Sequence, residues 1–255
     1  KRQVLTYAIF TGLACFATQW WHLLIFRFVA ALGIGGEWAA GSALVAETLH
    51  GRHKAWASAF LQSGYMTGCI LASLTSGLMR DLDPRWVFIV GVLPAFLTVF
   101  IRRAVPEPEG WAHAARSQAM PPVSALFAPG LARTTILVTL FCSCSMVIAW
   151  AFLSFMPGLI ASIPEVKSWD RARVAQFTTH VALVFFSANI AANFFATYLA
   201  KHAGHRFAFA FMMLVGGLVF WFGFASTPTT TSVYWVASAA AFFGLGYFGL
   251  YPMYI

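Results

Sequence analysis

Charged residues are scarce in this chain, and their scarcity excludes an ordinary soluble domain. Only 9% of its 255 residues are Asp, Glu, Lys or Arg, whereas soluble domains carry about 25%. Hydrophobic residues make up 60%, and the mean hydropathy is +0.75. The apolar runs are long enough for helices that cross a bilayer at 1.5 Å per residue. The composition therefore predicts an all-α integral membrane protein.

The chain also lacks the side-chain groupings of common enzyme and metal sites. Its four cysteines all lie in apolar runs, where we interpret them as small buried hydrophobes: Cys15, Cys69, Cys142 and Cys144. His50-Gly-Arg-His53 is flanked by like charge and has no completing acid, so it does not predict a metal site. No nucleophile–base pair or phosphate loop is recognisable. The sequence predicts no catalytic residues, no metal and no cofactor, with a membrane enzyme or a non-transporting membrane protein as alternatives.

Acidic residues are half as numerous as basic ones, 8 against 16, which gives a net charge of +8. This excess follows the predicted topology. If Lys1 and Arg2 are cytoplasmic, ten basic residues fall in cytoplasmic segments, five in outer loops, and Arg27 inside a span. The positive-inside rule favours that orientation. We therefore expect the basic residues to face anionic lipid, and we predict the bilayer, not nucleic acid, as a partner.

About eight apolar segments predict membrane spans. They are residues 4–21, 23–46, 55–79, 86–101, 134–161, 174–200, 207–225 and 232–255. Residues 104–133 hold five prolines and no spanning run, which predicts a cytoplasmic linker. The linker separates an N-terminal helical half, 1–103, from a C-terminal helical half, 134–255.

A glycine-centred segment occurs twice, about 210 residues apart, as Gly33-Ile-Gly35 and Gly244-Leu-Gly246. Each copy ends an apolar stretch that opens on basic residues, so the pattern indicates two parallel pseudo-repeats. The implied repeat is six helices, and the chain would hold helices 3 to 10 of a twelve-helix parent. Gly244–Gly249 also matches a nucleotide-binding glycine pattern, but no strand precedes it. We interpret these glycines as close-packing positions on membrane helices.

Five motifs carry a family resemblance. They are Arg27 with Gly33-x-Gly35-Gly36-Glu37-Trp38, Glu47 followed by Arg52 and Lys54, Val105-Pro-Glu-Pro-Glu109, Trp150-Ala-Phe-Leu-Ser-Phe-Met-Pro157, and Gly244-Leu-Gly246 with Tyr251-Pro252. With the architecture above, they resemble the major facilitator superfamily, in its metabolite:proton symporter and carboxylate (lactate/sialate-type) transporter groups. One departure is Lys201, which stands where the family commonly has an acidic residue.

The resemblance implies a secondary active transporter that moves a small organic solute with protons by alternating access. A carboxylate or other organic anion is the expected solute, and a zwitterion or a sugar is the alternative. The same resemblance implies a protein of the cell (plasma or inner) membrane that acts as a monomer.

Two ionisable residues are candidates for proton coupling. Glu37 lies deepest in its predicted span, where a dehydrated carboxyl can take up and release a proton. Its alternative role is a structural carboxylate bonded to a neighbouring helix. His180 lies about two turns inside another span, where a histidine is either a proton carrier or a hydrogen-bonded cavity residue.

Polar and aromatic residues on the helices that line the family's central cavity are candidates for contact with the solute, because lipid cannot satisfy polar groups. They are Arg27, Gln62, Tyr65, Trp150, Asn189, Asn193, Tyr247 and Tyr251. For Arg27 the alternative is a structural cation, and for the aromatics it is packing. A cytoplasmic gate of salt bridges is predicted from Glu47, Arg52, Arg102, Arg103, Glu107 and Glu109. The alternative there is a solvated face of weak pairs.

Overall fold

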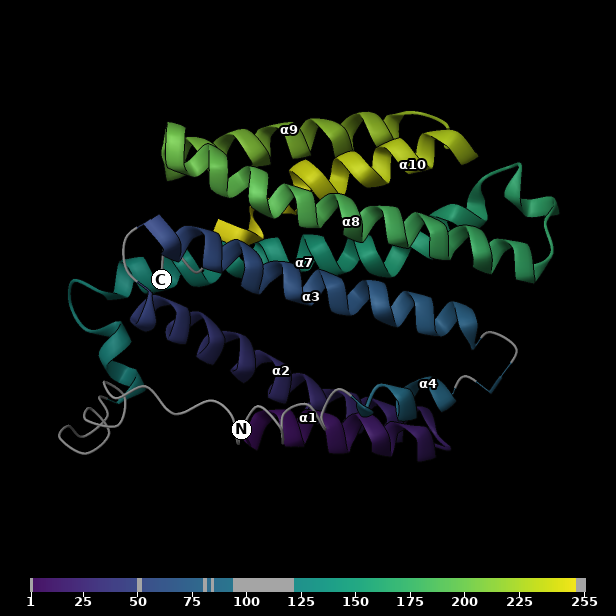
Figure 1. Ribbon diagram of the computed structural model, residues 1–255, viewed down its shortest axis with the longest axis horizontal. Coiled ribbons are helices and arrows are strands. Elements are labelled where there is room, and N and C mark those ends of the chain that lie inside the picture. Colours follow the sequence, from purple (N-terminus) through teal and green to yellow (C-terminus); the bar gives the residue numbers. More distant parts are fainter. Residues whose placement is uncertain (1, 50–51, 80–81, 84, 94–121, 251–255) are drawn as a thin grey trace. The chain divides into compact units, whose positions relative to one another are not determined.

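The described residues form a succession of helices (Figure 1). The computed structural model describes residues 2–49, 52–79, 82–83, 85–93 and 122–250, and it has no strand within those ranges. The helices are α1 (Arg2–Leu13), η1 (Ala14–Phe16), α2 (Trp20–Thr48), α3 (Arg52–Leu78), α4 (Arg85–Val90), η2 (Val123–Phe127), α7 (Ala132–Ser162), η3 (Val166–Ser168), α8 (Arg171–Ala203), α9 (His205–Ala225), α10 (Thr230–Ala239), η4 (Ala240–Gly244) and η5 (Gly246–Leu250).

Five segments among the described residues are long and apolar enough to cross a membrane. They are Trp20–Ala43, Ala132–Ser162, Arg171–Ala203, His205–Gly223 and Thr230–Leu250. The predicted span 4–21 corresponds to a shorter apolar helix, Leu5–Phe16, and the span 55–79 to the more polar α3. The second half of the predicted span 86–101, residues 94–101, lies outside the described residues. The all-α membrane fold is therefore confirmed.

Contacts divide the chain into two compact units, residues 1–104 with 163–255, and residues 105–162. The second unit contains η2 and α7, with Pro157 inside the helix. In the first unit α3 packs along α8, α1 packs against α2, and α8 also contacts α9, α10, η4 and η5 (Figure 1). α8 is thus the helix around which the second half of this unit is built.

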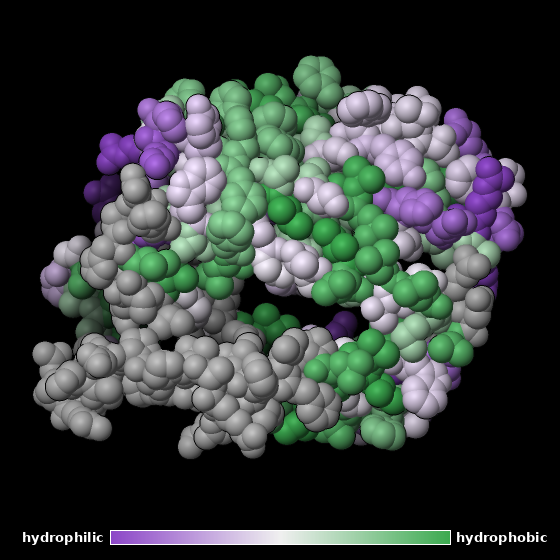
Figure 2. All heavy atoms as spheres, viewed as in Figure 1, coloured by the Kyte–Doolittle hydropathy of each residue, from purple (hydrophilic) through white to green (hydrophobic). Residues whose placement is uncertain are grey.

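The ends of α8, α9 and α10 are set by local sequence. Asp170 caps α8 by accepting from the backbone N–H of Arg173 at 3.3 Å. Gly204, with φ of 87°, turns the chain from α8 into α9. Thr229 and Ser232 form a capping box at the start of α10. In Figure 2 hydrophilic residues gather toward both ends of these helices, and hydrophobic residues cover the surface between them.

The last described span is not the single helix that the apolar run 232–255 predicts. α10 ends at Ala239, η4 continues as a π-helical turn, and η5 is a 3-10 turn. Leu245, between the two turns, has φ of −129° and ψ of −9°, which are not α-helical. Interruptions of this kind shift backbone groups out of the regular ladder, so those groups need other partners.

Candidate functional site

Two asparagines of α8 supply partners to the interrupted helix. Asn189 and Asn193 are four residues apart, hence on one face of α8, and both are 0% exposed. Asn189 donates from Nδ2 to the Ala241 carbonyl at 2.9 Å, and Asn193 donates to Asn189 Oδ1 at 3.3 Å. The Gly249 N–H donates to Asn193 Oδ1 at 3.1 Å. Side chains of α8 therefore bond directly to the backbone of η4 and η5.

The same chain of hydrogen bonds continues to α3. The Ser58 hydroxyl donates to the Gly249 carbonyl at 2.7 Å, and Ser58 is 0% exposed. We call Ser58, Asn189 and Asn193, with the backbone of Ala241 and Gly249, the polar seam. Gln62, one turn further along α3 on the same face, is also buried. Because each buried polar atom of the seam has a partner in protein, the seam is stable inside an apolar surrounding.

Glycines allow the interrupted helix to approach its neighbours closely enough for these bonds. A methyl group on Gly246 would overlap Cβ of Ala192 and lie 3.0 Å from Cε of Met212. One on Gly249 would lie 3.0 Å from Oδ1 of Asn193. One on Gly244 would lie 2.7 Å from Cε2 of Phe220. The interpretation of the second glycine copy as a close-packing segment agrees with these contacts.

Aromatic rings surround the seam. Trp56 stacks on Phe194 of α8 with ring centroids 6.2 Å apart, and Phe60 meets the same ring edge-on at 5.1 Å. Tyr247 stacks on Phe248 at 5.2 Å and is only 2% exposed. Trp56 and Phe60 flank Ser58 in α3, and their contacts with Phe194 add apolar packing between α3 and α8 beside the seam.

Other predicted site residues are not among those that form the polar seam. Arg27 is exposed, and its guanidinium carbon lies 5.5 Å from the Phe88 ring centroid. That contact is typical of the structural role weighed for Arg27. His180 is exposed on α8, and Tyr65 of α3 is 44% exposed. Trp150 is 56% exposed and belongs to the other unit. Contact of these residues with a solute stays a prediction.

Several predicted residues lie outside what the structure describes. Glu37 and Glu47 fall within α2 and Arg52 begins α3, but their side chains are outside the described part. The remaining gate and cavity candidates lie in undescribed ranges: Arg102, Arg103, Glu107, Glu109 and Tyr251. The cytoplasmic gate and the Glu37 coupling site therefore stay predictions.

Ser58 and Thr197 belong to this region, although no motif marks them. Ser58 precedes Gln62 by four residues and Thr197 follows Asn193 by four, so helical spacing alone places each beside a predicted polar residue. Thr197 is 0% exposed, and its hydroxyl has no hydrogen-bond partner among the described residues. Extending the two polar stripes by one turn would have found both residues.

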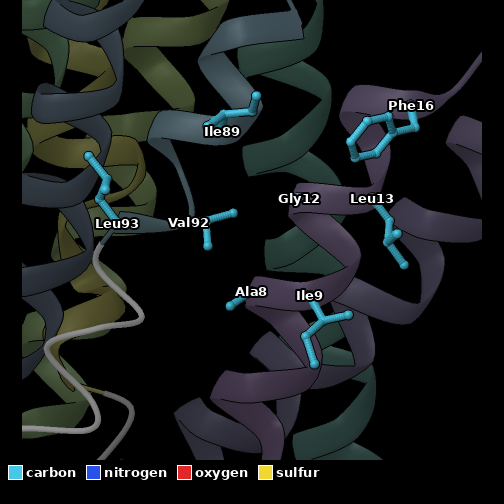
Figure 3. Close-up of a pocket in the computed structure, with 8 residues that line it drawn as sticks. All are labelled: Ala8, Ile9, Gly12, Leu13, Phe16, Ile89, Val92 and Leu93. Atoms are coloured by element: carbon cyan, nitrogen blue, oxygen red, sulfur yellow. The ribbon is translucent and has the colours of Figure 1, made fainter.

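A separate cavity of about 400 Å³ lies between α1 and residues 89–93 (Figure 3). It is lined by Ala8, Ile9, Gly12, Leu13, Phe16, Ile89, Val92 and Leu93. These side chains are all apolar, and none can donate a hydrogen bond or offer a charge to a carboxylate. The cavity therefore lacks the chemistry that recognition of an organic anion requires, and the polar seam is the stronger functional candidate.

The family model of the Major Facilitator Superfamily matches residues 4–255, nearly the whole chain. The chain belongs to the Major Facilitator Superfamily. The resemblance found in the sequence motifs is thereby confirmed. With its membrane-spanning helices, this member of the superfamily is a multi-pass protein of the cell (plasma or inner) membrane.

Curated relatives are similar over large parts of the chain. A "Probable 4-methylmuconolactone transporter" of Cupriavidus pinatubonensis is 34% identical over 163 residues, which are 62% of this chain and 38% of the relative. The sialic acid transporter NanX of Escherichia coli is 28% identical over 186 residues, 72% of this chain and 46% of the relative.

The cis,cis-muconate transport protein of Acinetobacter baylyi is 26% identical over 221 residues, 82% of this chain and 51% of the relative. The chain thus spans between 38% and 51% of the length of these three relatives. The superfamily and the relatives' names indicate transporters, not enzymes, in agreement with the sequence prediction.

Proposed function

We propose that this protein is a secondary active transporter of a small organic carboxylate, coupled to protons and working by alternating access. The superfamily match over residues 4–255 is the observation that carries the proposal. Support for the substrate class comes from relatives named for cis,cis-muconate and sialic acid, both of which are carboxylic acids. A zwitterion or a sugar remains the alternative solute.

The domain arrangement is part of the proposal. Residues 1–103 would form part of one helical half, 104–133 the cytoplasmic linker, and 134–255 part of the other. α3 would then belong to the first half, and α8 and η5 to the second. The Ser58–Gly249 hydrogen bond joins α3 to η5, so the polar seam would lie where the halves meet, as alternating access by rocking of the halves requires.

Proton coupling is assigned to Glu37, with His180 as the second candidate. A carboxyl on a membrane helix is neutral or charged according to its access to water, so its protonation can follow the conformation of the transporter. The candidates for the solute cavity are still the eight predicted residues: Arg27, Gln62, Tyr65, Trp150, Asn189, Asn193, Tyr247 and Tyr251. The predicted salt-bridge gate would close the cytoplasmic end.

The experiment uses protein expressed from its complete coding sequence and reconstituted into vesicles. Radiolabelled cis,cis-muconate, sialic acid and a neutral sugar are offered with and without an inward proton gradient. We expect saturable accumulation of one of the acids, and its loss when a protonophore removes the gradient. Accumulation of an acid that is equal with and without the gradient would contradict proton coupling. Accumulation of the sugar alone would contradict the carboxylate class.

A further inference from the structure

The polar seam joins elements that are far apart in the sequence. Ser58 and Gly249 are separated by 191 positions, yet their hydroxyl and carbonyl are 2.7 Å apart. Both partners are fully buried. The bond also links α3, which precedes residues 104–133, to η5, which follows them. A single buried hydrogen bond therefore connects segments on the two sides of the predicted linker.

The η4–η5 segment is held by side chains of another helix in addition to its own turns. Its Ala241 carbonyl bonds to Asn189, and its Gly249 N–H bonds to Asn193. π-helical and 3-10 turns are weaker than α-helix and are frequent at hinges. Glycine at positions 244, 246 and 249 leaves the backbone free to change its dihedral angles. The segment therefore has the glycine content of a hinge, and hydrogen bonds from side chains of α8 hold it in position.

We propose that residues 240–250 are a hinge and that the Ser58–Gly249 hydrogen bond is its latch, which holds one end of the protein closed. This inference rests on the proposed transport function. With the latch made, η5 lies against both α3 and α8. When it breaks, η5 moves away from α3, while Asn189 and Asn193 guide its motion along α8.

The predicted topology identifies the closed end. Ser58 lies near the start of α3, Asn193 and Thr197 lie near the end of α8, and Gly249 lies late in its span. All of these positions are cytoplasmic-side positions in the orientation that the basic residues favour. The hinge therefore closes the cytoplasmic end, at a depth beyond the predicted salt-bridge gate.

A cysteine at Thr197 reports on the latch. Thr197 is fully buried, lies on the seam face of α8, and has a hydroxyl with no partner in the described part of the chain, so Thr197→Cys removes no hydrogen bond that the structure shows. The reporter is placed in full-length protein whose native Cys15, Cys69, Cys142 and Cys144 are replaced by serine. The protein is held in nanodiscs, where a water-soluble maleimide reaches both membrane faces. The labelling rate is compared among the reporter alone, reporter with Ser58→Ala, and reporter with Ser63→Ala.

Ser63→Ala is the matched control, because Ser63 is a buried serine of the same helix whose hydroxyl bonds only within α3, to the Ala59 carbonyl at 2.7 Å. Loss of one buried hydrogen bond shifts an equilibrium about three- to tenfold. We expect labelling about three- to tenfold faster with Ser58→Ala and unchanged with Ser63→Ala. Equal rates in all three proteins, or equal acceleration by both substitutions, would overturn the latch.

The labelling needs no solute, so it separates this inference from the proposed function. Uptake of an acid by the reporter protein with three equal labelling rates would overturn the latch and leave transport standing. Faster labelling in Ser58→Ala protein, with no uptake of any tested acid by wild-type protein, would support the hinge and overturn the proposed function.

Discussion

The two glycine-centred helices, α2 and α10–η5, share a sequence pattern but differ in backbone. α2 continues without interruption from Trp20 to Thr48 through Gly33 and Gly35. The second copy changes from α to π to 3-10 around Gly244 and Gly246. A methyl on Gly35 would meet nothing within 4 Å among the described residues, whereas one on Gly246 would overlap Ala192.

Glycine alone therefore does not interrupt a membrane helix. The interruption occurs where a neighbouring helix offers amide side chains to the freed backbone groups, as Asn189 and Asn193 do for η4 and η5. α2 instead carries Glu37, an acid two residues after Gly35. The duplicated pattern would thus serve two purposes, a proposed coupling acid in one copy and a hinge in the other.

The largest effect is expected from removal of the charge in the first copy. Glu37→Gln keeps shape and hydrogen bonding but cannot release a proton, so accumulation driven by the proton gradient should be lost while exchange of solute across the membrane continues. One proton moving down a gradient of one pH unit releases about 1.36 kcal/mol, which can drive about tenfold accumulation of the solute. The variant should lose this accumulation. Uptake and exchange in vesicles measure both. Accumulation equal to wild type would assign the coupling to another residue.

In the second copy, Asn193→Leu should be the most damaging change. It leaves the Gly249 N–H and the Asn189 oxygen without their partner while the number of side-chain heavy atoms stays the same, at a cost of about 2–3 kcal/mol. Thermal unfolding in nanodiscs should occur roughly 5–10 °C lower. If Asn193→Leu protein unfolded at the same temperature as wild-type protein, Asn193 would not stabilise the interrupted helix.

Paired glycine substitutions sharpen the contrast between the copies. Gly246→Ala forces a methyl against Ala192 and Met212 and should destabilise by about 1–3 kcal/mol. Gly35→Ala meets open space in a continuous helix and should be neutral or stabilise by up to about 1 kcal/mol. The unfolding midpoints of the two variants give the comparison. Equal destabilisation in both would mean that the copies are packed alike.

Thr197→Val should have the smallest effect. Thr197 is buried beside the seam, but its hydroxyl has no partner within the ranges that the structure describes, so its loss should change stability by less than about 0.5 kcal/mol or increase it. Chemical unfolding of this variant beside Asn193→Leu tests whether hydrogen bonds, and not mere polarity, matter on this face. A loss as large as that of Asn193→Leu would show that Thr197 has a partner of its own.

Sequence predicts five of the spans that the described residues contain and the polar face of α8, because apolar length and the four-residue spacing of Asn189 and Asn193 are local properties. It does not predict the interruption at residues 240–250, since the apolar run there continues unbroken. Ser58 escapes prediction for a related reason, because its partner is a backbone carbonyl 191 positions away. Every residue has a backbone carbonyl, so no sequence motif can show which carbonyl accepts such a bond. Helical spacing from Gln62 was the available signal.

The site residues that were predicted from their charge have different surroundings from those that were predicted from their amide groups. Asn189 and Asn193 are brought together with other buried groups, whereas Arg27 and His180 are exposed and apart from them. Charge and depth along a span can be inferred from sequence, but the direction a residue faces in a bundle depends on neighbouring helices. The asparagines were predictable as a pair because α8 alone fixes their common face.

Asparagines of α8 bond to the interrupted helix at residues 240–250, whereas the equivalent copy in α2 is a continuous helix. Amide hydrogen exchange of wild-type and Asn193→Leu protein in nanodiscs, followed peptide by peptide, tests whether these bonds hold the interrupted helix in place. We expect amides of residues 240–250 to exchange about tenfold faster in the variant, in line with the loss of about 1.4 kcal/mol or more of local stability, and amides of residues 30–41 to exchange at an unchanged rate. Unchanged exchange at 240–250, or equal acceleration in both segments, would contradict this expectation.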